Sequence, residues 1–277
     1  MAPDHIIDIL IAERAPTLAK TSMWPLLRPP LYVALGYRKA RAMADIIARL
    51  PGAEALDYVS DLLALKIEVR GLDRIPATGR SVIVANHPTG IADGLAMYGA
   101  LKPRRPDAIF FANADALRVS PQLGDVLIPV EWVEAKRTRE KTRDTLLRAR
   151  DAFDQDRCLV VFPAGRLATR DRRGVLNDPL WQPSAVSLAR KYAAPIIPIH
   201  MIGPWSTLFH TFNRVSQELR DITLFHEMLN KRGRTFRLIV GHPIAPDTLD
   251  TDAGVATAAL KAYVERRLPA DPDVAFA

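Results

Sequence analysis

The stretch Ser81-Val-Ile-Val-Ala85, followed at once by Asn86-His-Pro-Thr-Gly-Ile-Ala-Asp93-Gly94, decides the fold. Its first five residues are mostly β-branched and apolar, which predicts a buried strand. Similar runs predict further strands at 67–69, 108–112, 126–130, 159–162, 196–201 and 235–240. Helical patterns over 139–154 and 183–192 lie between some of these runs. Strands that alternate with helices predict an α/β domain over 66–277, with a central, largely parallel sheet flanked by helices.

The first 65 residues form a different region, which the sequence predicts to be helical. Ile7, Leu10 and Ile11 follow the spacing of an amphipathic helix. A second helix is expected to begin after Pro30 and to end at Pro51-Gly52, and a third follows up to residue 65. We therefore expect an N-terminal helical segment, 1–65, ahead of the α/β domain.

An apolar surface in this helical segment suits docking on a membrane. Its apolar residues and the cations beside them are Trp24, Leu26, Leu27, Leu31 and Tyr32 with Arg28, Arg38 and Lys39. A helix of this composition can lie in the interface of an anionic bilayer, and an ordinary helical hairpin packed on the domain is an equal alternative. No apolar stretch reaches the ~18 residues that a spanning helix needs, and the N-terminus does not resemble a secretory signal. We expect a peripheral protein on the cytoplasmic face of the inner membrane.

The composition limits the classes of partner. The 277 residues carry a net charge of +7, and the isoelectric point is about 9.7. This balance is compatible with nucleic acid, an anionic membrane surface or a phosphorylated substrate. The chain has neither an aromatic RNA-binding signature nor a zinc finger, so we expect no nucleic-acid partner. The single cysteine, Cys158, lies in an apolar run and is expected to be a buried hydrophobic residue.

The first string of polar residues follows the predicted strand that ends at Ala85. His87 then lies at the carboxyl end of a strand, where parallel sheets bind ligands. Asp93 can fold back to the imidazole across a turn that Pro88 and Gly90 favour. A carboxylate that accepts from one ring nitrogen fixes the tautomer, which leaves the other nitrogen as a base for an attacking hydroxyl. The alternative is structural: His87 caps a turn and Asp93 caps the next helix, a role that can coexist with the catalytic one.

Two further strings combine prolines with apolar residues. In Phe162-Pro-Ala-Gly165-Arg166, the glycine allows a backbone N–H to approach an anion, and the arginine binds phosphate as a planar fork. More cations follow at Arg170, Arg172 and Arg173, and a plain turn with exposed arginines is the alternative. In 194–199, Pro195 and Pro198 suit a central strand poorly, so we expect the bent start of a strand.

Together and in this order, the three strings resemble the glycerolipid acyltransferase (PlsC-like) family. Its members carry Asn-His-x4-Asp, then a Phe-Pro-Glu-Gly-Thr-Arg type of block, then a proline-rich apolar block. The resemblance covers residues 66–246. The spacing here is His-x5-Asp, which is similar to the branch described as hemolysin-like acyltransferases, so Asp93 is kept as the partner of His87.

Two other features depart from the family pattern. Ala164 stands where the commoner form of the Phe-Pro block has glutamate, and Leu167 follows the arginine. This departure puts recognition of a glycerol-3-phosphate type of head group in doubt. The family also has a block that ends in arginine between the first two strings. Residues 128–132 occupy its position without one, and Arg137 or Arg139 is a candidate substitute.

The resemblance implies a direct acyl transfer. A fatty acyl chain passes from acyl-CoA or acyl carrier protein to the hydroxyl of a lysophospholipid such as 1-acyl-glycerol-3-phosphate, in phospholipid biosynthesis. His87 removes the hydroxyl proton and Asp93 orients His87, without a metal, a bound cofactor or a covalent acyl-enzyme. The residues that the resemblance assigns to substrate binding are Asn86, Gly90, Phe162, Pro163, Gly165 and Arg166.

Three other functions remain open at this stage. In the first, the acceptor is another lysolipid, such as a lyso-ornithine lipid. In the second, water replaces the lysolipid and the protein is a thioesterase. A lipase is disfavoured because the chain has no Gly-x-Ser-x-Gly elbow. A non-catalytic membrane adaptor with the same fold is the third alternative, and it would have no need of His87.

Overall fold

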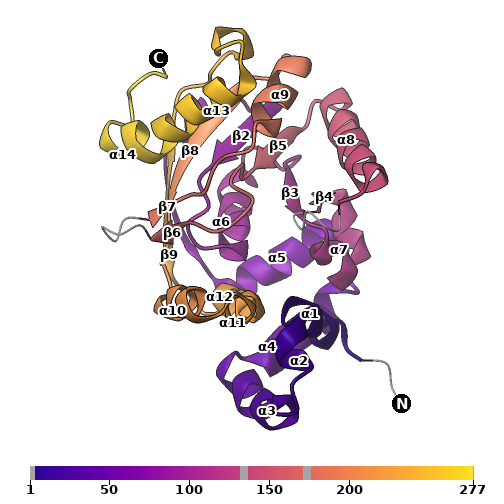
Figure 1. Cartoon of the computed structure of the whole chain (residues 1–277). Coiled ribbons are helices and arrows are strands. Elements are labelled where there is room, and N and C mark those ends of the chain that lie inside the picture. The colour runs from indigo at the N-terminus through magenta and orange to yellow at the C-terminus, as the bar shows by residue number, and fades with distance from the viewer. Residues whose placement is uncertain (1–3, 132–136, 171–175, 277) are drawn as a thin grey trace.

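A largely parallel sheet forms the centre of the chain (Figure 1). The computed structural model describes residues 4–131, 137–170 and 176–276. Within these ranges the sheet has seven strands in the order β1-β9-β8-β2-β5-β3-β4. They are β1 Lys66–Arg70, β2 Ser81–Ala85, β3 Ile109–Asn113, β4 Leu127–Val130, β5 Cys158–Val161, β8 Ile196–Ile202 and β9 Thr235–Val240.

The strand directions set one edge of the sheet apart from the other. β8, β2, β5, β3 and β4 pair in parallel, whereas β9 runs antiparallel to β8 and β1 runs parallel to β9. The carboxyl ends of the five mutually parallel strands therefore meet at one edge, where sheets of this type bind ligands. The predicted α/β class with a largely parallel sheet is confirmed.

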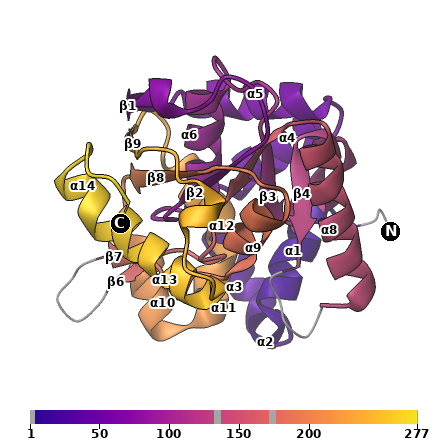
Figure 2. The ribbon, with the colours of Figure 1, turned by 90° about the horizontal axis from the view of Figure 1, so that it is seen from above.

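Helices cover both faces of this sheet (Figures 1 and 2). α5 Gly52–Leu63 and α6 Ile91–Leu101 pack on one face, and α8 Arg139–Asp154, α9 Ser184–Lys191 and α13 Ala253–Ala262 pack on the other. The shorter elements are α7 Asp115–Val119, α10 Thr207–Val215, α11 Gln217–Ile222, α12 Leu224–Leu229, α14 Leu268–Ala270, a π-helical turn Tyr263–Arg267 and a hairpin of β6 Thr169–Arg170 with β7 Leu176–Asn177.

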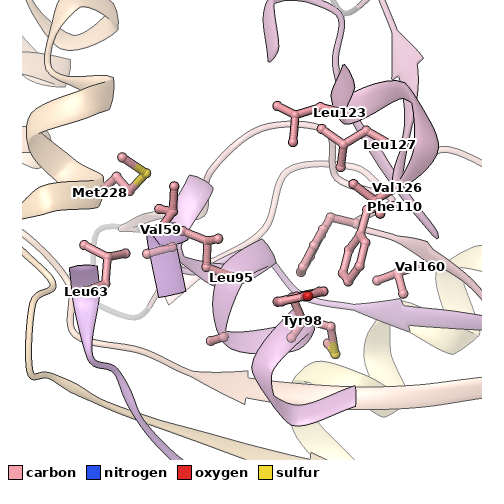
Figure 3. Packing of buried hydrophobic residues seen from close by; sticks show 14 of the residues in the cluster. Val59, Leu63, Leu95, Tyr98, Phe110, Leu123, Val126, Leu127, Val160 and Met228 are labelled. Carbon is pink, nitrogen blue, oxygen red and sulfur yellow. The ribbon is translucent and has the colours of Figure 1, made fainter. Parts of the chain in front are cut away.

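The side chains of β2 alternate between two buried clusters. Ile83 and Ala85 belong to the cluster on the α5–α6 face, and Val82 and Val84 belong to the cluster on the α8–α9 face. Because both faces of the strand are covered, it reads as an unbroken apolar run rather than an alternating one. Figure 3 shows part of the first cluster, in which the ring of Tyr98 from α6 lies near Phe110 of β3, between strand and helix.

A glycine, and not a proline, separates the third N-terminal helix from the fourth. The prediction of a helix that begins after Pro30 is wrong, because α3 Trp24–Ala34 contains Pro29 and Pro30. Each proline removes a helical hydrogen bond without ending the helix. α3 instead ends where Gly36 adopts a left-handed conformation with a φ of 67°, and α4 Tyr37–Ile47 begins there. The helical prediction for this region is otherwise confirmed, with α1 Ile6–Arg14 and α2 Pro16–Ala19 preceding α3.

The N-terminal helices share a core with the sheet and also expose apolar side chains. The buried face of α1 belongs to the same cluster as the inner face of α6. Trp24, Leu31 and Tyr32 pack partly against that cluster, whereas Leu26 and Val33 are 70% and 81% exposed. Among the described residues, no helix is both long and apolar enough to cross a bilayer. The division of the chain at residue 65 stays a prediction.

The interior strand β8 corrects the expectation for the third string. β8 lies between β9 and β2 and contains Pro198, which pairs with Val84 of β2. The ladder with β9 starts one residue later, at Ile199 and Val240, so Pro198 falls beyond the end of β9. Its carbonyl accepts from Gly241 N–H at 2.9 Å. The proline is tolerated because the neighbouring ladder does not need its missing N–H.

Cys158 begins β5 and is fully buried, as the sequence predicts. Burial raises the pKa of its thiol to about 11. The side chain lies in the cluster on the α5–α6 face. It therefore acts as a small core residue.

Candidate active site

His87 lies just beyond the carboxyl end of β2, at the edge where the parallel strands end. Its side chain is 17% exposed, so the imidazole is largely enclosed and still open to solvent. Nδ1 lies 2.9 Å from Oδ2 of Asp93. The ring stacks on Phe162, with 4.6 Å between the ring centroids. The fold thus brings the predicted pair of His87 and Asp93 together, and adds Phe162 to it.

The Asp93 carboxylate is fully buried and accepts hydrogen bonds on both oxygens. Oδ2 accepts from the His87 ring and from the backbone N–H groups of Thr89 (2.8 Å) and Gly90 (3.0 Å). Oδ1 accepts from the Thr89 hydroxyl. The bond from Gly90 is also a cap of α6, because Asp93 is the third residue of that helix. Capping the helix and contacting the imidazole therefore coexist in one carboxylate.

Gly90 permits this arrangement of donors. Its backbone has a φ of 100° and a ψ of −137°, a region that residues with a side chain avoid. A Cβ at this position would also lie 3.1 Å from Cδ2 of Leu167. A side chain here would therefore strain the turn that directs two backbone N–H groups at Asp93.

The hydrogen bonds around Asp93 determine the tautomer of His87. A carboxylate that receives donors from Thr89 and Gly90 acts as an acceptor toward the ring as well. Nδ1 therefore carries the ring proton and donates it to Asp93. Nε2 is left with a lone pair. The pair can serve as a general base toward a hydroxyl placed against Nε2.

The string Phe162–Arg166 forms a turn directly after β5. Gly165 has a φ of 62°, and its N–H donates to the Phe162 carbonyl at 3.0 Å. That N–H is used inside the turn and is not directed at a ligand. Arg166 is exposed, and within the described part of the chain it has no hydrogen-bond or ion-pair partner. Its guanidinium is available to an anion.

Asn86 and Pro163 are tied to neighbouring main chain. The Asn86 amide donates to the Met201 carbonyl at 2.9 Å and accepts from the Met201 N–H at 2.7 Å. This contact joins the end of β2 to β8. The Pro163 carbonyl accepts from Gln182 N–H at 2.9 Å. Both residues are adjacent in sequence to groups of the site, and their part in substrate binding stays a prediction.

The sequence did not indicate a second carboxylate, Asp178, beside His87. Both of its oxygens accept from the His87 backbone N–H, each at 3.1 Å. Oδ2 also accepts from the indole N–H of Trp181 at 2.9 Å. Burial raises the pKa of Asp178 to about 6, and the charge of Glu265 acts in the same direction. No motif of the sequence marks this residue, because His87 lies 91 residues away in the chain.

Other residues that the sequence singled out contact groups other than His87 or lie outside the described residues. His200 donates from Nδ1 to the Val264 carbonyl at 2.9 Å, and burial lowers its pKa. Arg137 donates to the Glu131 carbonyl. Trp132, Arg172 and Arg173 lie outside the described residues. Across 4–131, 137–170 and 176–276, no group of three or more His, Cys, Asp or Glu side chains is arranged to hold a metal ion.

Similar proteins carry acyltransferase descriptions. A family model described as Acyltransferase matches residues 66–202. A lyso-glycine lipid O-acyltransferase of Phocaeicola vulgatus is 28% identical over 205 residues, which cover 72% of this chain and 71% of the relative. A protein with the same description from Bacteroides thetaiotaomicron is 26% identical and covers 72% and 73%.

A solved structure has the same fold. The crystal structure of the 1-acyl-sn-glycerophosphate (LPA) acyltransferase from Thermotoga maritima matches with a TM-score of 0.51 and 14% sequence identity, over 96% of both chains. At this identity the likeness concerns the fold. The family match, 66–202, contains His87, Asp93 and the Phe162–Arg166 turn. The chain belongs to the glycerolipid acyltransferase family and is an acyl-transferring enzyme.

Proposed function

We propose that the protein transfers a fatty acyl group from a thioester to the hydroxyl of a lysolipid whose head group is an amino acid, such as a lyso-glycine lipid. The observation that carries this proposal is the buried Asp93 carboxylate on Nδ1 of His87, which leaves Nε2 as a base at the ligand-binding edge of the sheet. The descriptions of the two bacterial relatives support the class of acceptor.

In the proposed reaction, Nε2 of His87 removes the proton of the acceptor hydroxyl as the hydroxyl oxygen attacks the thioester carbonyl. Asp93 stabilises the imidazolium that forms. The carbon–sulfur bond then breaks, and His87 returns the proton to the departing thiolate. The products are the new ester and the free thiol of coenzyme A or of acyl carrier protein, so the reaction balances without a covalent acyl-enzyme.

Arg166 is the proposed partner of the anionic head group. Its exposed guanidinium belongs to the turn that also holds Phe162 against His87. A glycine head group offers one carboxylate, which a guanidinium binds as a planar fork. Ala164 stands where the commoner form of the family has glutamate, which supports an acceptor other than 1-acyl-glycerol-3-phosphate. Gly90, Gly165, Pro163 and Asn86 are proposed to shape the walls of this site.

The proposed place of action is an anionic membrane surface on the cytoplasmic side. Leu26, Leu27 and Val33 of α3 are exposed, and the cations Arg38 and Lys39 follow at the start of α4. Apolar side chains beside cations suit the interface of an anionic bilayer. In flotation with anionic vesicles, Leu26→Glu/Leu27→Glu is expected to lower the bound fraction and His87→Ala to leave it unchanged.

The test of the reaction is mass spectrometry of the purified protein with vesicles, both types of thioester donor and three acceptors. The acceptors are a lyso-glycine lipid, a lyso-ornithine lipid and 1-acyl-glycerol-3-phosphate. His87→Ala is compared with His242→Ala, which removes an exposed imidazole just after β9, at the opposite edge of the sheet. We expect the diacyl glycine lipid from the wild type and from His242→Ala, and none from His87→Ala.

Each other outcome contradicts part of the proposal. Preference for 1-acyl-glycerol-3-phosphate would assign the chain to phospholipid biosynthesis, and preference for the ornithine lipid would change the head group. Free fatty acid without a diacyl product would favour a thioesterase. Equal product from His87→Ala and wild type would remove His87 from the mechanism, and no turnover with any acceptor would favour a membrane adaptor.

A further inference from the structure

The β6–β7 hairpin holds the main chain of His87 at both of its polar groups. The His87 carbonyl accepts from the N–H of Ala168, the residue before β6, at 3.0 Å. The His87 N–H donates to both oxygens of Asp178, the residue after β7, at 3.1 Å. The residues at the two ends of one hairpin therefore both bond to the main chain of His87. Its main chain is fixed independently of the contact between its ring and Asp93.

Asp178 is itself held from a second direction. Its backbone N–H donates to Oε1 of Glu265 at 2.9 Å, and Oε2 of Glu265 pairs with Lys261. Glu265 lies in the π-helical turn Tyr263–Arg267. Short π turns within helices are frequent at functional sites. A continuous set of hydrogen bonds thus runs from the C-terminal helix through Asp178 to His87.

Burying the charged carboxylate of Asp178 costs free energy that a purely structural contact would not require. The residue is 7% exposed, and burial together with the nearby Glu265 charge disfavours its ionised form. A backbone carbonyl or a water could satisfy one N–H at lower cost. What the carboxylate adds is two acceptor oxygens in a fixed plane, and the indole N–H of Trp181 holds that plane at 2.9 Å.

We propose that Asp178 is a positioning residue for acyl transfer, which fixes the main chain of His87 and is fixed in turn by Glu265. The inference rests on the proposed role of His87 as the base. Asp93 sets the tautomer and the rotation of the ring, but the position of the Cα atom sets how close Nε2 comes to the acceptor hydroxyl. A displacement of about 1 Å in such a geometry can reduce the rate by ~10²-fold.

The first test compares Asp178→Ala with Asp178→Asn. Asp178→Ala removes both acceptors and is expected to lower kcat by ~10- to 10²-fold with little change in the KM for either substrate. Asp178→Asn is expected to recover most of kcat, because an amide oxygen in the place of Oδ2 still reaches the His87 N–H and the Trp181 indole. A purely structural role would instead lower the melting temperature of Asp178→Ala and leave kcat unchanged in both variants.

The second test replaces Glu265, which contacts Asp178 and not His87. Glu265→Ala removes the acceptor of the Asp178 N–H and is expected to lower kcat less than Asp178→Ala, whereas Glu265→Gln keeps an oxygen in that place and is expected to match the wild type. This pair decides the proposal if Asp178→Ala does not fold. Asp107→Ala is the matched control. Asp107 accepts from the Cys158 N–H at 3.0 Å, at the amino end of β5 and away from His87, so the control is expected to lose stability and keep kcat.

A measurement without substrate separates this inference from the proposed reaction. The Nδ1 proton of His87 is expected to give a low-field ¹H NMR resonance, identified by its loss in His87→Ala. Asp178→Ala is expected to shift or broaden it, and Asp107→Ala to leave it in place. An unchanged resonance together with unchanged kcat in Asp178→Ala would overturn the inference. So would an equal fall of kcat in Asp107→Ala. A shifted resonance in a protein that acylates nothing would support the positioning and contradict the reaction.

Discussion

Two buried carboxylates flank His87, and the chain builds them in different ways. Asp93 lies six residues from His87, on the helix that follows the same strand, and it contacts the ring. Asp178 lies 91 residues away, and it contacts the main chain. It depends on Glu265, another 87 residues along. The ring and the main chain of one histidine are therefore controlled by separate regions, a short local turn and a junction of distant segments.

Replacing His87 gives the largest expected effect. It tests whether the residue that both carboxylates contact is needed for acyl transfer. His87→Ala is expected to lower kcat by about 10³-fold, within the range that general acid–base catalysis contributes. The product is measured as diacyl lipid by mass spectrometry. His242→Ala is expected to retain wild-type activity. If both variants lost activity equally, His87 would not be identified as the base, and no catalytic role could be assigned to Asp93 or Asp178 through their contacts with it.

Asp93→Asn tests the local side of the comparison. The amide can donate to Nδ1, which would favour the tautomer with the proton on Nε2, so kcat is expected to fall by about 10²- to 10³-fold. Thermal unfolding of the same variant measures the loss of the α6 cap. A variant that lost stability and kept kcat would reduce Asp93 to a capping residue.

A pH series sharpens the comparison from the side of Asp178. Burial raises its pKa from 3.8 to about 6, so the folded chain favours the protonated carboxyl. Below pH 3.8 both the folded and the unfolded chain hold the proton. As the pH rises through about 6, the buried charge costs the folded state up to about 3 kcal/mol. Asp178→Asn lacks this cost. Its free energy of unfolding is therefore expected to rise relative to that of the wild type between pH 3.8 and about 6.

Urea unfolding at several pH values measures this difference. The control is Asp144→Asn, which removes an exposed carboxylate on α8 that pairs with Arg148. Its difference from the wild type is expected to stay flat over the same window. A flat difference for Asp178→Asn as well would mean that the buried carboxyl does not change its protonation on unfolding.

The smallest expected effect concerns the head group rather than His87. Arg166→Gln removes one charge-assisted contact with the acceptor, so KM for the lyso-glycine lipid is expected to rise about tenfold with little change in kcat. Arg266→Gln removes another exposed arginine and is the matched control. A fall in kcat without a rise in KM would mean that Arg166 acts in the chemical step, as is proposed for the two carboxylates, and not in binding the acceptor.

The local patterns of the sequence were sufficient to predict the sheet. Strands over 81–85 and 235–240 and the helix over 139–154 have the predicted bounds, because covered strands and amphipathic helices leave periodic apolar patterns. Two predictions were wrong where neighbours override local preference. Pro198 lies in an interior strand because β9 ends beside it. The chain turns at Gly36 and not at Pro30.

The candidate site was predictable to the extent that it is local. His87, Asp93 and Gly90 lie within one turn, so their spacing indicated the contact between ring and carboxylate. Phe162 was expected at the site but not as the platform of the imidazole, since that contact depends on the pairing of β2 with β5. Asp178 could not be predicted at all. Its contact depends on a hairpin and on a helix near the C-terminus, and no pattern of single residues records where those elements meet.

The burial of Cys158 has a practical consequence for studies of the membrane. It is the chain's single thiol, and a pKa of about 11 leaves almost none of it as the reactive thiolate at neutral pH. The natural sequence is therefore already suited to site-specific labelling with maleimide reagents. A cysteine introduced at Leu26 or Val33, both exposed on α3, would take up a fluorophore selectively. Quenching by lipids brominated at known depths would then report how far that helix enters a bilayer.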